Sequence, residues 1–232
     1  YSRILLNTLI KGAINMISVC AISVGQIKQL DYGQKREMLS ALNKSPISET
    51  MWLSRTGFVE DEQAYKGHGG PHKAVCCFSK SHYQMYRNDL NTIPDYAMFG
   101  ENLTLENLDE ADVFFGNQYR LGEAILEVSE IREPCWKIQT KYGIKDLVKR
   151  MSTSGKTGFC FRVLQEGYVD QDDDLELIQL ADEATRLSVQ ELNDIYYNDR
   201  KNVSRLKYAL QNPYLSEMRL AKLQKLYDNA MK

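Results

Sequence analysis

The chain has 232 residues, of which 43% are hydrophobic and 26% are charged. This composition is typical of globular proteins and excludes disordered and fibrous classes. At roughly 100 to 200 residues per domain, the length fits one main domain with a small appendage. The 29 basic and 31 acidic side chains give a net charge of -2, so no overall field attracts nucleic acid or an anionic membrane. We expect neither partner, and any anion site must be local.

The cysteines and the N-terminal residues indicate the cellular compartment in which we expect the protein. The sequence has five cysteines, an odd number, and no two of them form a CxxC pair, which predicts free thiols in a reducing cytoplasm. The stretch 4–24 is interrupted by polar residues such as Asn7 and Lys11, so it lacks the roughly 18 to 20 continuous apolar residues of a membrane span. It also lacks a signal-peptide cleavage pattern. The first strand-like run begins at Met16, and we interpret residues 1–15 as an extension outside the folded domain.

Strand signals dominate the chain from Met16 to about residue 180. Runs rich in β-branched and aromatic residues predict strands at 17–24, 26–30, 50–53, 74–78, within 113–128, at 159–164 and at 175–180. The run 159–164 is expected to form a hairpin with the strand that follows Gly167. Apolar spacing predicts helices at 79–90 and 144–151. The sequence therefore predicts a mainly β domain with a few helices.

The pattern becomes helical after residue 184. Ser188 followed by Glu191 is a capping-box signal, and two further helices are predicted at 202–211 and 216–230. The charge balance changes at the same place: residues 166–183 include eight acidic and no basic side chains, whereas 184–232 include nine basic and five acidic ones. We predict a main domain at 16–184 and a three-helix module at 185–232.

The three histidines, His68, His72 and His82, lie close together in the sequence. A four-residue spacing such as His68 to His72 faces one metal only from a helix, and the intervening Gly69-Gly70-Pro71 excludes that helix. We therefore prefer a loop whose backbone N–H groups cradle an anion, with Lys73 beside it. A plain turn is the alternative.

Cys135 is the strongest chemical candidate. It follows a strand in the segment Arg132-Glu133-Pro134-Cys135-Trp136-Lys137, and nearby cations favour the thiolate, the form that bonds soft metals or attacks electrophiles. The alternative is a buried structural cysteine. Cys76 and Cys77 lie in an apolar strand and Cys160 lies between two phenylalanines, so we interpret those three as core.

Several motifs in order resemble those of the MOSC domain, a family named for the C-terminal part of molybdenum cofactor sulfurase. They are Gly57 with Asp61-Glu62-Gln63, His68-Gly69-Gly70-Pro71 with Lys73-Ala74-Val75, Phe99-Gly100-Glu101-Asn102-Leu103, and Arg132, Pro134-Cys135 and Lys137. The chain is most similar to the stand-alone bacterial YiiM-like members, which also end in a three-helix module, and the resemblance covers nearly the whole chain from Met16. It implies an α+β, mainly β fold: a MOSC-type β-barrel with peripheral helices and a small C-terminal three-helix module.

The resemblance also implies a function. YiiM-like proteins reduce N-hydroxylated compounds such as hydroxylaminopurine bases to amines, with electrons from a flavin reductase. It implies a cytoplasmic enzyme, a monomer or homodimer, that binds the molybdenum cofactor, with Cys135 as the metal ligand; pyridoxal phosphate is not expected. The implied catalytic residues are Cys135, Glu101 as a proton donor, and Asn102. The implied cofactor-binding residues are Asp61, His68, Gly69, Gly70, His72, Lys73, Arg132 and Lys137.

The sequence departs from the family pattern at His72, where aspartate is usual, so the contact made there with substrate or pterin is expected to differ. Two other functions remain open. In the first, Cys135 carries a persulfide and delivers sulfur for metal–sulfur cofactor assembly. In the second, the pocket has lost its chemistry and the basic helical tail docks a partner. We favour helices that simply pack on the barrel over a tail that meets an electron donor.

Overall fold

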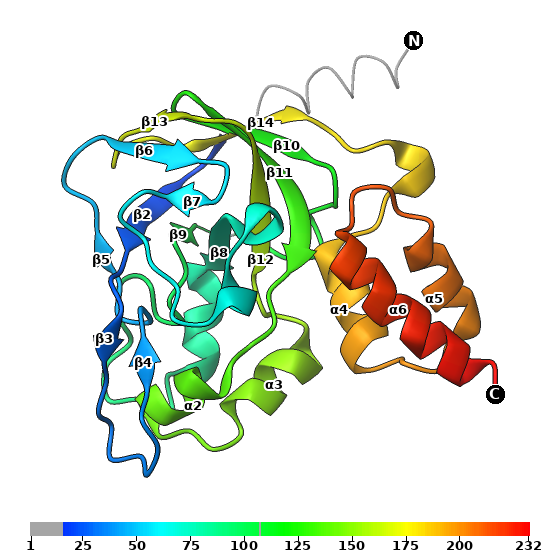
Figure 1. The fold of residues 1–232 in the computed structure, drawn as a ribbon, viewed down its shortest axis with the longest axis horizontal. Coiled ribbons are helices and arrows are strands. Elements are labelled where there is room, and N and C mark those ends of the chain that lie inside the picture. Colours follow the sequence, from blue (N-terminus) through cyan, green and yellow to red (C-terminus); the bar gives the residue numbers. More distant parts are fainter. Residues whose placement is uncertain (1–15, 107) are drawn as a thin grey trace.

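The computed structural model describes residues 16–106 and 108–232, so the predicted extension 1–15 lies outside the described residues. It is a mixed α+β fold in which a nine-stranded sheet forms the centre (Figure 1). In spatial order, the strands are β1 (Met16–Ile17), β14 (Leu175–Gln179), β10 (Gln118–Leu121), β11 (Ala124–Ile131), β12 (Phe159–Gln165), β8 (Val75–Ser79), β9 (Leu103–Leu105), β2 (Val19–Val24) and β5 (Ser45–Pro46). β8 and β9 pair in parallel, and the other neighbours pair antiparallel.

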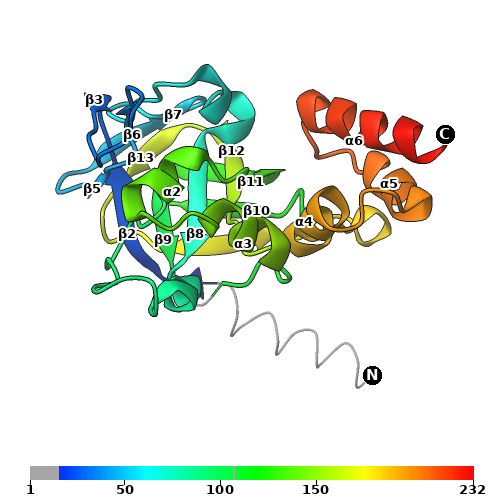
Figure 2. The ribbon, with the colours of Figure 1, turned by 90° about the horizontal axis from the view of Figure 1, so that it is seen from below.

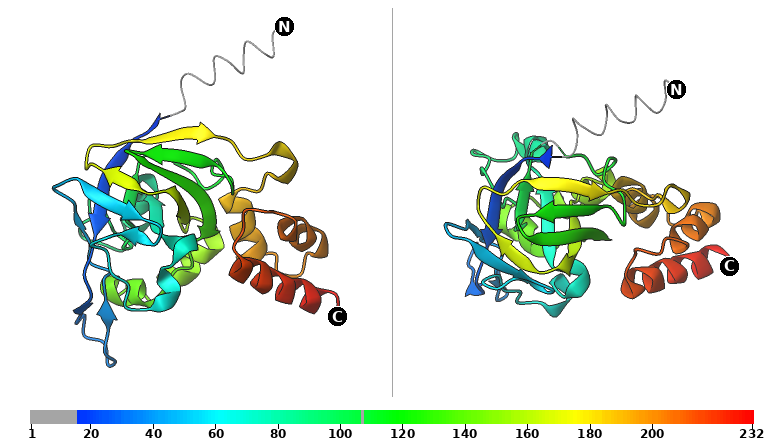
Figure 3. Two further views of the ribbon diagram at one scale, coloured as in Figure 1. Left: turned by 45° about the horizontal axis from the view of Figure 1, so that its top comes forward. Right: turned by 90° about the horizontal axis from the view of Figure 1, so that it is seen from above.

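The sheet curls round on itself because one segment reaches both of its ends. Only Ser18 separates β1 from β2, yet β1 pairs with β14 at one end of the strand order and β2 pairs with β9 near the other end. Figure 3 shows the resulting barrel-like wrapping of the strands. The predicted barrel-like β domain with peripheral helices is confirmed.

Two small sheets complete the β structure. β13 (Gly167–Val169), β6 (Met51–Ser54) and β7 (Gly57–Phe58) form one, and β3 (Lys28–Gln29) and β4 (Leu39–Ser40) form the other. The predicted hairpin between 159–164 and the next strand is wrong. β12 already has β11 on one side and β8 on the other, so β13 crosses to pair with β6.

Successive side chains of the central strands point alternately into the barrel and to its outer face. Val75 and Cys77 on β8 are fully buried in the main core, as is Phe161 on β12. Cys76, between Val75 and Cys77, and Cys160, next to Phe161, therefore point to the opposite face of the sheet. That outer face carries the cavity described below.

Two helices and a 3-10 helix enclose a second core beside the barrel. They are α2 (Trp136–Tyr142), α3 (Leu147–Ser154) and η3 (Lys80–Tyr86), and three shorter 3-10 turns, η1 (Lys66–His68), η2 (Pro71–Lys73) and η4 (Glu183–Thr185), lie elsewhere. The helix predicted at 79–90 is shorter and of the 3-10 type, and the helix predicted at 144–151 lies at 147–154. Helix α2 was not predicted.

The C-terminal helices lie together at one side of the barrel (Figures 1 and 2). They are α4 (Val189–Tyr197), α5 (Val203–Leu210) and α6 (Glu217–Ala230). The predicted capping box of Ser188 and Glu191 is confirmed, and the side chains of Asn202 and Ser216 cap α5 and α6. Residues of all three helices belong to the same hydrophobic core as the barrel, and the domain boundary at 184 stays a prediction. Among the described residues, every helix is too short or too polar to cross a membrane.

Candidate functional site

A cavity of about 530 Å³ opens on the outer face of the sheet, between the η1–η2 loop, α2 and α6. This volume lies within the range of roughly 300 to 1,000 Å³ that is typical of small-molecule sites. The side chains that bear on its chemistry are Lys44, Asp61, His68, Lys73, Cys76, Asn102, Arg132, Glu133, Cys135, Lys137, Cys160 and Lys222. The cavity thus gathers most of the residues that the sequence singled out.

Cys135 is one of the residues that line this cavity. It is half-buried and unpaired, and it occupies the N-cap position of α2. The N–H of Ile138 donates a hydrogen bond to the carbonyl of Cys135 over 3.1 Å, which fixes the residue to the first turn of the helix. A second hollow of about 550 Å³ shares Cys135, Trp136 and Lys137 with the cavity, so this thiol lines both hollows.

Three cations of the cavity bind backbone carbonyls. Lys73 donates to the carbonyl of Gly67 (2.8 Å), Lys137 donates to that of Leu39 (2.6 Å), and Arg132 donates to that of Phe99. Within the described residues, none of the three has a carboxylate at ion-pair distance. Their charges are therefore available to an anionic ligand.

Asp61 and Asn102 form a fixed polar network in the wall. The carboxylate of Asp61 accepts hydrogen bonds from the N–H of Gly25 (2.8 Å) and from the Asn102 amide (2.9 Å), and it pairs with Lys44. The Asn102 carbonyl oxygen accepts from the N–H of Cys76 over 3.0 Å. Asn102 thus connects three segments of the chain, and its role in catalysis stays a prediction.

His68 is a neutral imidazole at physiological pH. Burial, followed by the charges of Arg132, Lys137 and Lys73, lowers its pKa to about 4. Its ring packs edge-on against Tyr65, with 5.1 Å between ring centroids. A neutral ring offers one donor and one acceptor nitrogen to a ligand.

Cys76 is partly exposed, so our interpretation of it as core is wrong, whereas Cys160 is buried as expected. Both line the cavity, whereas Cys77 is fully buried in the barrel. The period of two along a strand gives the physical reason, because neighbours of buried residues face the other side of the sheet. The pattern Phe159-Cys160-Phe161 carried that signal.

Four residues that the sequence assigned to the site do not line the cavity. The carboxylate of Glu101 is fully buried, and it accepts from the Tyr83 hydroxyl and, over 3.0 Å, from the N–H of Phe99. It therefore supports the loop and does not reach a ligand in this arrangement. The imidazole of His72 lies 3.4 Å from the guanidinium of Arg162 and is not part of the cavity lining.

Gly69 and Gly70, the other two, shape the turn whose neighbours Gly67, His68 and Lys73 form the wall. A Cβ on Gly69 would lie 2.4 Å from the Gln63 amide oxygen, and Gly70 has a φ of +99°. These glycines therefore permit the turn, and their backbone is not part of the cavity lining.

The C-terminal helices reach the site, which the sequence did not show. Met218 and Lys222 of α6 belong to the cavity lining. Lys222 and Arg219 both pair with Glu133 at 2.5 Å, two residues before Cys135, and Arg219 also pairs with Glu130 at 2.7 Å. The spacing of basic residues in 216–230 gave no indication of these partners.

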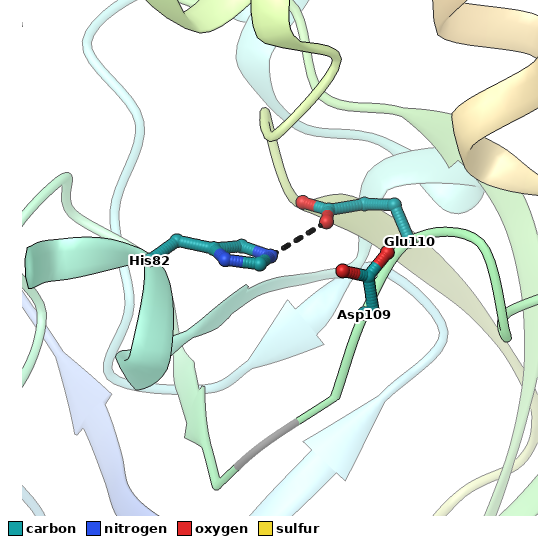
Figure 4. A group of neighbouring side chains, drawn as sticks. All are labelled: His82, Asp109 and Glu110. Atoms are coloured by element: carbon teal, nitrogen blue, oxygen red, sulfur yellow. Dashed lines mark hydrogen bonds and ion pairs between the residues drawn. The ribbon is translucent and has the colours of Figure 1, made fainter. Parts of the chain in front are cut away.

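One group of possible metal ligands lies outside the cavity. His82, Asp109 and Glu110 are the three residues of the described chain whose ligand atoms cluster closely enough (Figure 4). The imidazole of His82 is 2.8 Å from Glu110, and the ammonium of Lys156 lies 3.8 Å from Glu110 and contacts Asp109. Since that ammonium already supplies a positive charge, we assign the cluster to structure. His68 and His72 are not part of this group.

Comparison with known proteins places this geometry in a family. The model of the MOSC domain matches residues 64–176. The chain is 37% identical over 215 residues to the uncharacterized protein YflK of Bacillus subtilis, covering 92% of this chain and 96% of that protein. The crystal structure of YiiM from Geobacillus stearothermophilus superposes with a TM-score of 0.76 at 31% identity, covering 91% of this chain and 99% of that one. A protein of Gibberella moniliformis named reductase is 33% identical over 162 residues, which are 68% of this chain and 28% of that protein. The chain therefore belongs to the MOSC domain family.

Proposed function

We propose that the cavity binds the molybdenum cofactor and that Cys135 is its metal ligand. The observation that carries this proposal is the half-buried thiol of Cys135 in a cavity with three cations that bind no carboxylate. A thiolate suits a soft metal centre, and Lys73, Arg132 and Lys137 suit the phosphate of the cofactor. The donor set and the volume of the cavity therefore fit the group.

We propose further that the protein is a reductase of N-hydroxylated compounds, such as N-hydroxylaminopurine bases, with a flavin reductase as electron donor. The cofactor supplies two-electron chemistry when bound, and the protein supplies orientation and electrostatics. Membership of the MOSC domain family and the similarity to a protein named reductase support this function.

The residues of the chain have defined tasks in this proposal. Neutral His68 offers hydrogen bonds at the cavity wall without adding a charge. Asp61 and Asn102 keep that wall rigid through their contacts with Gly25 and Cys76. A rigid wall preorganises the polar groups that orient a ligand.

Metal analysis tests the assignment of Cys135. Protein produced in cells that make the cofactor should contain about one molybdenum per chain, and Cys135→Ala should lose it. Cys20→Ala is a matched control, because Cys20 is exposed and hydrogen-bonds to Glu106. Equal molybdenum in the Cys135→Ala protein would refute the ligand assignment.

The same preparations separate the reductase from a sulfur carrier. Cyanide-labile sulfur on Cys135 in metal-free protein would favour the carrier, whereas reduction of an N-hydroxylated purine by molybdenum-containing protein favours the reductase. Lys73→Met should retain the fold and weaken cofactor retention, because it removes a cation that has no carboxylate partner in the described chain. Arg120→Met, which removes a cation paired with Glu176 at 3.6 Å, is the matched control.

A further inference from the structure

Cys76 and Cys160 stand directly opposite one another on antiparallel strands. They are register partners between β8 and β12. The backbone of Cys76 bonds to Asn102 instead of to Cys160: its N–H donates to the Asn102 side chain (3.0 Å), and its carbonyl accepts from the Asn102 N–H (2.7 Å). The two cysteines therefore form a non-hydrogen-bonded pair, in which Cα atoms are about 4.5 Å apart. Disulfides span roughly 4.4 to 6.8 Å between Cα atoms.

Both thiols face the same cavity and are unpaired. Cys160 is buried, with 4% of its surface exposed, whereas Cys76 is partly exposed. A small molecule in the cavity thus meets Cys76 first. Since directly opposed residues of antiparallel strands project to the same face, Cys160 lies beside Cys76 as a second thiol.

The surroundings favour a thiolate on Cys76. The neighbouring Cys160 thiol is the largest influence, and with the charge of Arg132 it lowers the pKa of Cys76 below its ordinary value. The proximity of Cys76, followed by burial, raises the pKa of Cys160 well above its ordinary value. One thiol is thus suited to attack first, and the other to remain protonated until a bond has formed beside it.

We propose that Cys76 and Cys160 form an oxidisable dithiol site in the wall of the cavity, and that its reaction partner is an anionic low-molecular-weight disulfide. The Cys76 thiolate attacks one sulfur of this disulfide, whose S–S bond breaks, and one small thiolate leaves and takes a proton. Cys160 then loses its proton and attacks Sγ of Cys76 in the mixed disulfide, which releases the second small thiol. Two protein thiols are oxidised to one disulfide, and one small disulfide is reduced to two thiols.

The charge of the cavity selects the reaction partner. Lys73 and Arg132 line it, and in the described chain neither has a carboxylate partner at ion-pair distance. An anionic disulfide such as oxidised glutathione is attracted to these cations, whereas the dication cystamine is repelled. The site requires neither the molybdenum cofactor nor Cys135, so it stands apart from the proposed function.

The test is thiol mapping of the full chain. Reduced protein is incubated with oxidised glutathione, denatured and alkylated; two of its five thiols should escape alkylation. Tryptic peptides 74–80 and 157–162 should be cross-linked, and fragment ions must assign the bond to Cys76, because Cys77 lies in the same peptide. Alkylation of all five thiols, or a bond to Cys77 or Cys135, would overturn the proposal.

Variants test the order of attack. Cys160→Ser should accumulate one glutathione on Cys76, because no second thiol releases it, and Cys76→Ser should form neither the adduct nor the disulfide. Cys20→Ala is the matched control and should behave as wild type. Cys135→Ala should also still form the disulfide, and this result separates the dithiol site from the proposed cofactor site.

The rate of disulfide formation provides a second test, which needs no variant. Oxidised glutathione should form the disulfide about tenfold faster than cystamine at low salt, an effect at the lower end of electrostatic steering. The difference should shrink at high ionic strength, where the charges are screened. Equal rates at low salt would overturn the cavity as the place of reaction.

Discussion

Arg219 and Glu130 form a fully buried ion pair between α6 and β11, and its disruption should be costly. Both side chains are 0% exposed, and Arg219 Nε lies 2.7 Å from Glu130 Oε1. Glu130 also accepts hydrogen bonds from the Ser216 hydroxyl and the Ile131 N–H, each over 2.9 Å. The guanidinium of Arg219 lies 4.5 Å from the centroid of the Tyr196 ring. Arg219→Met therefore leaves a buried carboxylate without its counter-ion.

The expected loss of stability follows from that unpaired charge. Removing one partner of a buried pair costs about 3 to 5 kcal/mol. For a protein of this size, this cost lowers the midpoint of thermal unfolding by about 6 to 20 °C. Urea unfolding of wild type and variant, followed by circular dichroism, measures the difference in the free energy of unfolding.

Two further variants make the reasoning refutable. Arg120→Met breaks an exposed pair with Glu176, 3.6 Å long and 55% and 39% exposed, and it should cost no more than about 1 kcal/mol. The double variant Glu130→Gln/Arg219→Met removes both charges, so it should be more stable than Arg219→Met alone. A double variant as unstable as the single one, or an equal loss for Arg120→Met, would refute the argument.

Three other predictions concern the cavity and its frame. Asn102→Ala should lower the free energy of unfolding by about 1 to 3 kcal/mol, because it removes a buried amide and leaves the part-buried N–H of Cys76 without its acceptor; an unchanged urea midpoint would contradict this. His68 should remain neutral down to about pH 4 in NMR titrations. Because the pKa of His68 is lower in the folded state, the unfolded chain binds more protons than the folded chain between about pH 6.5 and pH 4. The stability that the neutral imidazole contributes should therefore be lost as the pH falls through that window. Titration of His68 near pH 6.5 would contradict this prediction. Gly158→Ala should destabilise more than Gly143→Ala, because both residues have positive φ but a Cβ on Gly158 would lie 2.2 Å from a backbone oxygen, whereas Gly143 has open space; equal thermal midpoints would count against the contact.

Local signals in the sequence were sufficient for much of the fold. The C-terminal helices were located because their caps are local: the hydroxyl of Ser188 accepts from the N–H of Glu191 within one turn. The central strands were located for a similar reason, since their β-branched and aromatic residues mark them. β13 was misplaced, however, because its pairing with β6 depends on which strand edges are free, and no local pattern encodes that.

The residues of the candidate site were predicted only in part. Cys135, Lys73, Arg132 and Lys137 lie in motifs, and the structure brings them to one cavity as expected. Glu101 also lies in a motif, but its carboxylate is committed to the Tyr83 hydroxyl, a partner 18 positions away that spacing does not reveal.

The contribution of α6 could not be predicted, because it arises from tertiary packing. Met218 and Lys222 reach the cavity because α6 packs against the barrel through the buried pair of Arg219 and Glu130 and through core residues such as Leu223. Deletion of residues 185–232 would therefore remove core as well as tail, and point substitutions such as Lys222→Ala are better probes of the tail.

Because α6 lines the cavity, a ligand bound there contacts the last helix of the chain. A molecule that fills the cavity touches the barrel and Lys222 together, so it bridges two parts of the chain that are distant in sequence. Amide protons of 217–230 should then exchange with deuterium more slowly when the cavity is filled, although that helix contains none of the family motifs. The C-terminal helix would thus report on a ligand whose other contacts lie more than fifty positions earlier in the chain.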